Sequence, residues 1–487
     1  MHRFRRFRTA TTATPGAGWG PALLLAAAAL LLFLALPQRT LHGADGDQFV
    51  VWLEQGRRDY PRHVAYLHLA GLVFGAGRAF GIGAYQALLL TSALGSAFAV
   101  LCLHRAFAVL SPWTGGRTLA PTLAALVTAP GFFYATCAEI HGVFVAGAAL
   151  SWWAFAHWLR RPRVARGLLT GAASGLAASV HAFGHLLPPL FVLAAVLLVR
   201  LPRQGRWRTV AALVGAHTCV AALLGWWLGA GPAGPACDAT QYVAEQLPWF
   251  APATAPEVLL REWIAPYLPW SVLAVAGLLV ARARPWACVT VAGLALHLPL
   301  TTLLLGHHHI DERGAYQLAL VLPAIVTSLR LLPASAFWLA PIASASLAVV
   351  TTLPEWRTPV SAAFVRGVAS LHAARPLVLV VARQELDGLR TQVPDLNVID
   401  FAAALEAYRT EWEQACTFDR WFDACYDEFE RRGQQLLLSA SVRARFAILP
   451  APDIRRFWDQ YVPQHYALVP ERRFGFAGCW VVRLPTR

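Results

Sequence analysis

Apolar segments of about 20 residues recur along the first 350 or so residues of this chain, and each is long enough to cross a bilayer as a helix. Hydrophobic residues make up 57% of the 487-residue chain and charged residues 14%, whereas soluble domains carry about 25% charged residues. This balance excludes a cytosolic globular protein. We expect an all-α polytopic membrane protein with eleven transmembrane helices, at 19–36, 84–103, 118–137, 140–158, 167–184, 186–199, 209–229, 269–281, 286–305, 315–331 and 333–352.

The apolar segment 61–80 also contains His63, His68 and Arg78, which favours an interfacial helix over a span. With this segment in the interface, seventeen arginines lie in inner loops and seven on the outer side of the membrane part, as the positive-inside rule requires. We therefore expect a cytoplasmic N-terminus over 1–18 and a membrane domain over 19–352 in the cell's inner membrane. Its larger outer loops are 37–83 and 230–268.

The formal net charge is +14, and all 41 basic residues counted in it are arginines, because the chain contains no lysine. The lack of lysine excludes Schiff-base catalysis and a P-loop lysine. Since most of the arginines fall in inner loops, the positive charge is an orientation signal. We expect the lipid bilayer as a partner and no nucleic acid.

Residues 353–487 contain the remaining sixteen acids and seventeen arginines and predict a small extracytoplasmic α/β domain. Apolar runs at 375–381 and 396–401 predict buried strands, and the patterns at 385–391 and 402–432 predict helices. A closing strand pair is expected within 474–484. Cys416 and Cys425 could form a disulfide there or remain free.

The acidic residues before position 353 are scarce, and in this topology all eleven lie on the outer side: Asp45, Asp47, Glu54, Asp59, Glu139, Asp238, Glu245, Glu257, Glu262, Asp311 and Glu312. Most of them simply avoid the inner loops. Glu139 is different, because it falls in an otherwise uncharged turn between two spans. A carboxylate at that depth is costly and points to function.

Four short motifs lie on this outer side. The first loop contains Ala44-Asp-Gly-Asp-Gln-Phe49, followed by Asp59-Tyr-Pro-Arg-His63. The others run from Phe132 to His141, from Ser179 to His185 and from Asp311 to Tyr316. Together they resemble the GT-C glycosyltransferases, and most of all the bacterial family related to transmembrane protein O-mannosyltransferases. The family forms are D-x-G-E-F then H-P-P, A-E-V-Y, S-H-H, and a charged turn before a late span. Here Gln48 replaces the glutamate and Tyr60 the histidine.

The resemblance implies a polyprenyl-phosphate sugar as donor, a protein or glycan as acceptor, and inversion at the sugar carbon. Transfer needs a base for the acceptor proton and donors around the departing phosphate. Asp45 or Asp47 would be the base, with Asp45 preferred by position. Arg313 would clamp the phosphate, since guanidinium matches phosphate oxygens in bidentate fashion. The remaining substrate-binding candidates are Glu139, His181, His185 and His63.

Each candidate also has a plainer explanation. Asp45 and Asp47 could be solvated turn residues, because Asp-Gly favours turns. His181 and His185, four residues apart on one helical face, could ligate a divalent metal or form a satisfied core pair. Arg313 could pair with Asp311 or Glu312. His307, His308 and His309 are more typical of a polar loop than of a metal site.

Two other functions remain open beside the glycosyltransferase. A transporter or flippase of a lipid-linked or anionic substrate would also use arginines and histidines near a cavity. Against it, the chain shows no internal repeat, and its charged residues gather on one face instead of at the midplane. A GT-C-like scaffold without activity is the other alternative, because of the departure at Gln48.

Overall fold

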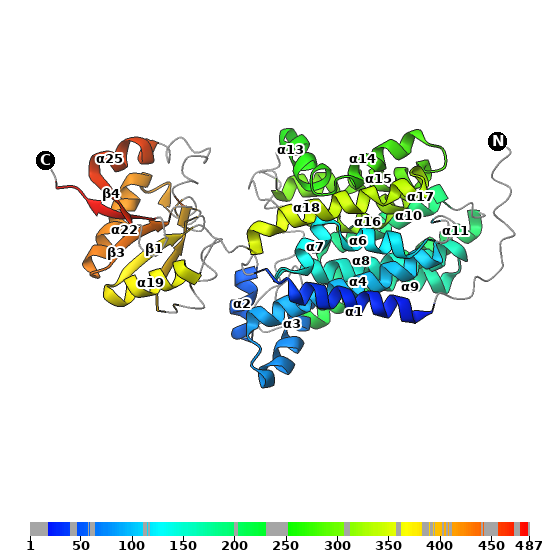
Figure 1. Cartoon of the computed structure of the whole chain (residues 1–487), viewed down its shortest axis with the longest axis horizontal. Helices are drawn as coiled ribbons and strands as arrows, with labels where there is room; N and C mark the ends of the chain where they lie inside the picture. The colour runs from blue at the N-terminus through cyan, green and yellow to red at the C-terminus, as the bar shows by residue number, and fades with distance from the viewer. Residues whose placement is uncertain are drawn as a thin grey trace. The chain divides into compact units, whose positions relative to one another are not determined.

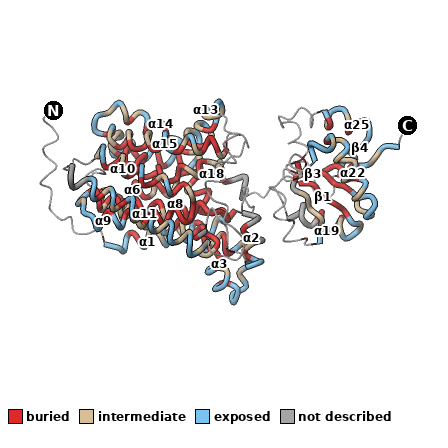
Figure 2. The backbone as a smooth tube through the Cα atoms, turned by 180° about the vertical axis from the view of Figure 1, so that it is seen from behind, coloured by how far each residue is buried: buried red, intermediate tan, exposed pale blue. Residues whose placement is uncertain are grey.

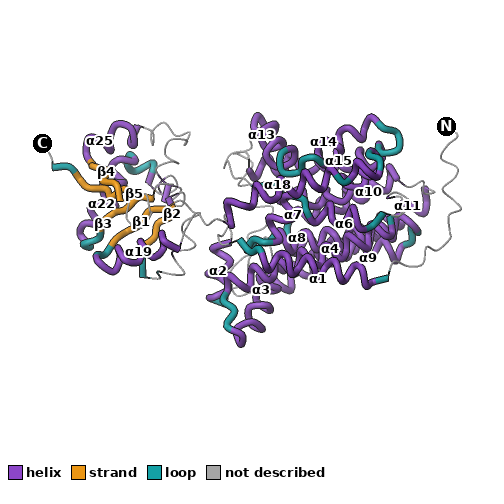
Figure 3. The backbone as a smooth tube through the Cα atoms, viewed as in Figure 1, coloured by secondary structure: helices purple, strands orange, loops and turns teal. Residues whose placement is uncertain are grey.

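The computed structural model describes residues 18–38, 46–56, 58, 64–110, 114, 117–198, 203–229, 252–305, 312–356, 362–381, 389, 393, 395–401, 404–405, 408, 412–439, 442, 456–471 and 478–485. The chain divides into two compact units: residues 1–38 with 48–353 form one, and residues 39–47 with 354–487 form the other. One unit is helical and the other contains a sheet (Figures 1 and 3). The predicted fold class, an α-helical membrane protein with a small C-terminal α/β domain, is confirmed.

The helical unit begins with α1 (Trp19–Ala35) and closes with α18 (Leu339–Trp356). Its other elements are α2 (Gly46–Glu54), α3 (Val64–Gly77), η2 (Arg78–Phe80), α4 (Ala84–Val109), α6 (Leu119–Leu126), α7 (Ala129–Ala135), α8 (His141–Arg160), α9 (Val164–Val180), η3 (Ala182–Leu186), α10 (Leu187–Leu198), α11 (Arg203–Gly229), η5 (Pro252–Thr254), α13 (Ala255–Leu259), η6 (Leu260–Ile264), α14 (Trp270–Ala276), η7 (Gly277–Leu279), α15 (Arg284–Leu305), η8 (Ala315–Leu320), α16 (Val321–Leu331) and α17 (Ala334–Phe337).

Among the described residues, five helices are long and apolar enough to cross a membrane: Ala84–Val109, His141–Arg160, Trp207–Leu228, Arg284–Leu305 and Ala334–Thr352. Five more segments are apolar but shorter. Large side chains such as Leu24 on α1 and Trp226 on α11 are more than 70% exposed, as lipid-facing residues are, while the buried residues gather inside the bundle (Figure 2). The count of eleven spans stays a prediction. The single helix expected over 118–137 was wrong, because the chain breaks at Val127–Thr128 into α6 and α7.

Arginines from the loops predicted as inner bond to main-chain oxygens near the ends of helices. Arg117 donates to Leu329 O at 3.2 Å, Arg282 to Leu331 O at 3.1 Å, and Arg166 to His157 O at 2.7 Å. These carbonyls belong to last turns of helices, where the helix dipole is negative and cations are favoured.

Helices α9 and α11 run parallel and meet along glycines spaced four residues apart. A Cβ built at Gly167 would lie 2.7 Å from Thr209 O, one at Gly171 would lie 2.1 Å from Leu213 O, and one at Gly175 would lie 2.8 Å from His217 O. Any side chain at these glycines would overlap the backbone of α11. This small-residue stripe is the packing device that membrane helices use for close approach.

The C-terminal unit is a five-stranded sheet with strand order β2-β1-β3-β5-β4. Strand β1 (Leu377–Val381) pairs in parallel with β2 (Asn397–Asp400) and β3 (Gln435–Ser439), whereas β5 (Gly478–Arg483) pairs antiparallel with β3 and with β4 (Tyr466–Glu471). Both faces of β1 are buried. Val378 and Val380 pack in one core with α22 (Phe418–Arg431), and Leu377 and Leu379 pack in the other with α19 (Ala362–Ala374).

The strands predicted at 375–381 and 396–401 are confirmed as β1 and β2. The closing pair expected within 474–484 is instead a hairpin of β4 and β5, so its first strand lies earlier in the chain. The helix expected over 402–432 is regular from Phe418 to Arg431, after a turn at 413–415. Cys416 and Cys425 are free thiols. The remaining helices are η10 (Phe457–Tyr461) and α25 (Val462–His465).

The contact between α9 and α11 yields a stability test. We expect Gly171→Ala to lower the free energy of unfolding by about 1–3 kcal/mol, because the added methyl must push α11 away from α9. The thermal midpoint of the detergent-solubilised protein measures this loss. Gly215→Ala is the matched control, since a Cβ at this α11 glycine would have nothing within 4 Å. Equal thermal midpoints for Gly171→Ala and Gly215→Ala would contradict the close contact between α9 and α11.

Candidate functional site

The structure describes four of the seven predicted site residues in full. Asp45 and His63 lie outside the described residues. Asp47 lies in the first turn of α2, and its backbone alone is described. Glu139, His181, His185 and Arg313 are all placed with their side chains.

Glu139 is 5% exposed and lies in the turn that joins α7 to α8. The hydroxyl of Ser92 on α4 donates to its carbonyl oxygen at 2.7 Å, and its own carboxylate accepts the Ile140 N–H at 3.1 Å. The turn can lie this close to α4 because Gly142 has no side chain; a Cβ there would be 2.7 Å from Ser92 O. A close helix contact at the end of the bundle thus holds the backbone of the turn that carries this buried carboxylate.

Two described parts of the first outer loop are anchored near this turn. At the start of the loop, the side-chain amide of Gln38 donates to Phe133 O at 2.7 Å and to Thr136 Oγ1 at 3.1 Å. Further along the loop, the ring of Phe49 on α2 packs against Tyr66 on α3, with centroids 5.1 Å apart. Tyr66 is fully buried and interacts electrostatically with Glu139. Asp45 directly precedes α2 in the chain and Asp47 lies in its first turn.

A second polar group, from α7, α8 and the turn at 312–314, lies at the same end. Tyr134 donates from its hydroxyl to Glu312 O at 2.7 Å and to the Glu312 carboxylate at 3.3 Å, and His141 Nε2 is 3.7 Å from that carboxylate. The carboxylates of Glu139, Glu262 and Glu312 all interact electrostatically with the Tyr134 phenol.

His181 joins this group through ring contacts. Its ring centroid is 5.1 Å from that of His141 and 5.4 Å from that of Tyr316, while Tyr316 stacks on Phe183 at 4.4 Å. These rings bring two imidazoles and a phenol together beside Glu312. Such a cluster can donate and accept protons and hydrogen bonds around a bound ligand.

His185 lies elsewhere, so the prediction that it shares a helical face with His181 was wrong. Helix α9 ends at Val180, and His181 is extended, with φ −151° and ψ 133°. His185 therefore points away and its Nδ1 lies 3.0 Å from Nε2 of His217 on α11, whose Nδ1 lies 2.9 Å from the Ser174 hydroxyl. In the described part of the chain, no three His, Cys, Asp or Glu side chains are grouped as a metal site would need.

Arg313 is held in the turn that follows the 306–311 segment. It has a positive φ of 46°, a conformation rare for a residue with a side chain. The guanidinium lies over the Phe133 ring, 4.4 Å from its centroid, and donates to Thr351 O at 3.1 Å.

Glu262 fixes this turn from η6. It is 0% exposed, and its two carboxylate oxygens accept the N–H groups of Glu312 at 3.1 Å and of Gly314 at 2.8 Å. Tyr267 donates to Gly314 O at 2.6 Å. Burial, and then the nearby Glu262 carboxylate, raise the pKa of Tyr267 well above its ordinary value, so the phenol stays a donor. Carboxylate and phenol thus hold both neighbours of Arg313.

Glu262 was predicted only as one of the outer acids, and its place in the site was not foreseen. His141 and Tyr134 were overlooked inside the motif that contains Glu139. Their signal was available, since His141 stands two residues after Glu139 in a stretch expected to lie at the membrane surface. No local sequence pattern indicates that Glu262 bonds to Glu312 and Gly314, because these residues lie 50 and 52 positions further along the chain.

No protein-family model matches the chain, and no curated protein matches it significantly. Among solved structures, the chain is similar to ArnT from Cupriavidus metallidurans bound to undecaprenyl phosphate, with a TM-score of 0.48 and 15% identity over 95% of this chain and 98% of that one. The same protein in its apo state matches with a TM-score of 0.47 and 16% identity over the same shares. Arabinofuranosyltransferase AftD from mycobacteria matches with a TM-score of 0.45 and 14% identity, over 87% of this chain and 37% of that one.

The Glu262 contacts yield a second stability test. Glu262→Gln should destabilise the protein by about 1.5–3 kcal/mol, because an amide can accept at one position while its NH₂ faces a backbone N–H at the other. The thermal midpoint reports the loss. Glu257→Gln is the control, since that carboxylate is 57% exposed and pairs with Arg261, whose guanidinium also lies 3.4 Å from the Glu262 carboxylate. Surface pairs are worth about 0–1 kcal/mol, and an equally large loss there would contradict the role of Glu262.

Proposed function

We propose that this protein is an integral-membrane glycosyltransferase of the GT-C type. In this proposal it moves a sugar, a hexose such as mannose, from a polyprenyl-phosphate carrier to a protein or glycan acceptor on the outer face of the inner membrane. The observation that carries the proposal is that the Glu139 turn, Gln38 and Phe49 of the first loop, and the Arg313 turn lie at one end of the bundle. Each of the four motifs that carry the resemblance therefore has at least one described residue at that end.

The reaction asks two things of such a site. The acceptor hydroxyl attacks C1 of the sugar while its proton passes to a carboxylate, which we assign to Asp45, with Asp47 as the other candidate. The bond from C1 to the lipid phosphate oxygen breaks, and the electron pair leaves with the phosphate. Donors must therefore stabilise the charge that collects there.

Arg313 is suited to that second task. Guanidinium has five N–H donors in a planar fork and binds phosphate in bidentate fashion. Its turn is held by Glu262 and Tyr267, and its plane lies over Phe133, so the group is oriented before a ligand arrives. Glu139, His141 and His181 would contact sugar hydroxyls, and His63 is a further candidate. A divalent metal stays a candidate cofactor.

The topology is part of the proposal. The arginine-rich loops would face the cytoplasm together with residues 1–18, and the C-terminal domain would be extracytoplasmic. The acidic residues of the site then lie on the outer side, where a flipped lipid carrier presents its sugar.

The alternative is a transporter or flippase of a lipid-linked or anionic substrate. The hydrogen-bonded chain from the buried Ser174 and His217 to the exposed His185 favours it, because histidine chains in membrane proteins are typical of proton relays. Such a protein would move the lipid without breaking the bond to the sugar.

Turnover separates these functions. The purified full chain, given undecaprenyl-phosphate mannose and an acceptor extract, should release undecaprenyl phosphate. Undecaprenyl phosphate is the lipid held by one of the ArnT structures and is our probe for the class. Asp45→Asn should lower the rate about 10²–10⁴-fold, since it removes the base.

Asp395→Asn, on an exposed residue of the C-terminal unit, is the control and should leave the rate unchanged. Full turnover in Asp45→Asn would exclude this base, and Asp47→Asn would then test the other. Movement of the lipid across vesicles without bond cleavage would establish the transporter instead.

The phosphate role of Arg313 is tested by a change that keeps its charge. Arg313→Lys should lower kcat/KM for the lipid donor about tenfold or more, because an ammonium is a point charge without the bidentate fork. Arg282→Lys is the matched control, as this arginine bonds to the end of α16. Equal kcat/KM in the two variants would remove Arg313 from the phosphate site.

A further inference from the structure

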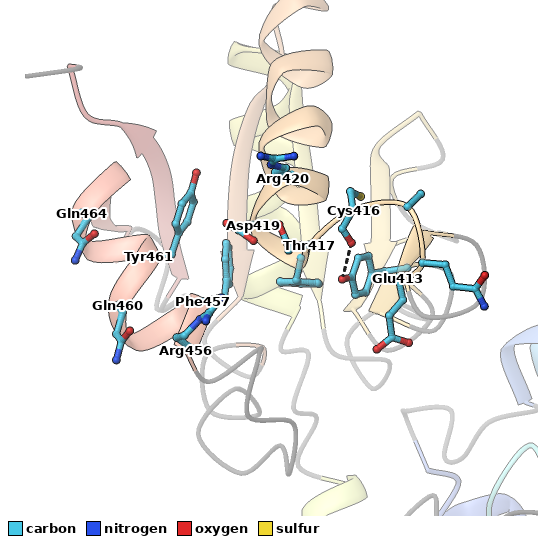
Figure 4. Close-up of a pocket in the computed structure, with 14 residues that line it drawn as sticks. Glu413, Cys416, Thr417, Asp419, Arg420, Arg456, Phe457, Gln460, Tyr461 and Gln464 are labelled. Atoms are coloured by element: carbon cyan, nitrogen blue, oxygen red, sulfur yellow. Dashed lines mark hydrogen bonds between the residues drawn. The ribbon is translucent and has the colours of Figure 1, made fainter.

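The C-terminal unit contains a groove of about 660 Å³ between two walls (Figure 4). One wall is the turn at 413–416 with the first turn of α22, and the other is η10 with α25. Ligand pockets in proteins typically measure about 300–1,000 Å³, so the groove can hold a molecule of two or three sugar rings.

The topology of the sheet supports a binding site at this place. Helix α22 joins β2 to β3, which are parallel to β1 in the order β2-β1-β3, so its first turn lies at the carboxyl ends of these strands. Open α/β sheets bind their ligands at that edge. The cavity and the strand order are independent observations, and they point to the same edge of the sheet.

The bottom of the groove is aromatic. Tyr408, Phe418 and Phe457 are each less than 10% exposed, and Tyr461 is half-buried. The rings are fixed by each other, since Phe418 meets Phe457 edge-on at 4.9 Å and Phe457 stacks on Tyr461 at 5.6 Å. The Tyr461 hydroxyl donates to Asp423 at 2.5 Å. Burial, and then the hydrogen bond to Asp423, raise the pKa of Tyr461 to about 12, so the ring stays neutral.

The rim is polar, and the charges of its described residues balance. It is lined by two acids, two arginines and three glutamine amides: Glu413, Asp419, Arg420, Arg456, Gln414, Gln460 and Gln464. Gln460 and Gln464 come from η10 and α25, whereas the acids come from the opposite wall (Figure 4), as does Gln414 from the turn at 413–416. Donors and acceptors are therefore present on two sides of the same aromatic surface.

This combination selects one ligand chemistry. A sugar ring has an apolar C–H face that packs on aromatic rings and a rim of hydroxyls that both donate and accept. Amides, carboxylates and guanidinium groups match those hydroxyls. A free phosphate is disfavoured because the two carboxylates would repel it. A lipid chain is disfavoured because it would remove water from the charged rim without replacing the lost hydrogen bonds.

We propose that this groove binds a neutral oligosaccharide. Its role as the subsite for a glycan acceptor rests on the proposed function, whereas sugar binding in itself does not. The acceptor would then be held through sugars other than the one that reacts. The class of acceptor would be glycan or glycosylated protein.

The test is equilibrium binding to the full-length protein in detergent, with mannotriose as the probe and calorimetry as the readout. Arg420→Ala and the double variant Gln460→Ala with Gln464→Ala should each raise the Kd for mannotriose about tenfold or more, because each loses hydrogen bonds to hydroxyls. Arg431→Ala is the matched control on the same helix. That arginine is 70% exposed, pairs with Glu428 and lies at the far end of α22, so its Kd should equal the wild-type value.

Circular dichroism of the variants shows whether each one folds, and every variant changes an exposed side chain. The same measurement on Asp45→Asn separates the two proposals, because that variant should bind mannotriose normally without any transfer. Wild-type protein that binds inorganic phosphate or a serine-rich peptide but not mannotriose would overturn the proposal. Binding of mannotriose with equal Kd in the Arg420, glutamine and Arg431 variants would also overturn it.

Discussion

A buried carboxylate that accepts two backbone N–H groups organises the candidate site. Glu262 accepts the N–H groups of the residues on either side of Arg313, and the Tyr267 phenol donates to a carbonyl oxygen of the same turn. Charge-assisted bonds of this kind are short and strong where water is excluded. They hold an arginine at a positive φ, which an unsupported turn would avoid.

Close helix contacts provide the frame for this turn. Glycines let α4 approach the start of α8 and let α9 approach α11, so that backbone atoms meet where side chains normally intervene. In a membrane the hydrophobic effect does not drive helices together, and van der Waals contact between small residues takes its place. Polar side chains that these contacts bring together, such as Ser92 with Glu139 and Ser174 with His217, gain partners that lipid cannot offer.

Prediction from sequence succeeded where one residue or one segment decides the outcome. Apolar length marked most of the helices, short apolar runs marked β1 and β2, and the lone acid Glu139 marked the end of the bundle that holds Arg313 and His181. It failed where partners are far apart in the chain. Helical spacing predicted that His181 and His185 share one face of a helix. The helix ends at Val180, however, and His181 contacts His141 on α8 while His185 bonds to His217 on α11.

The sequence by itself therefore determined that this chain is a helical membrane protein with a small α/β domain, and which of its few acids stand apart. Those properties follow from hydrophobic length and from the cost of charge in lipid, which act on each segment separately. Only the tertiary structure decided that Glu262 clamps the Arg313 turn, that Tyr134 and His141 share Glu312, and that an aromatic groove opens beside α22. Each of these depends on the distance between groups many residues apart, and packing alone sets that distance.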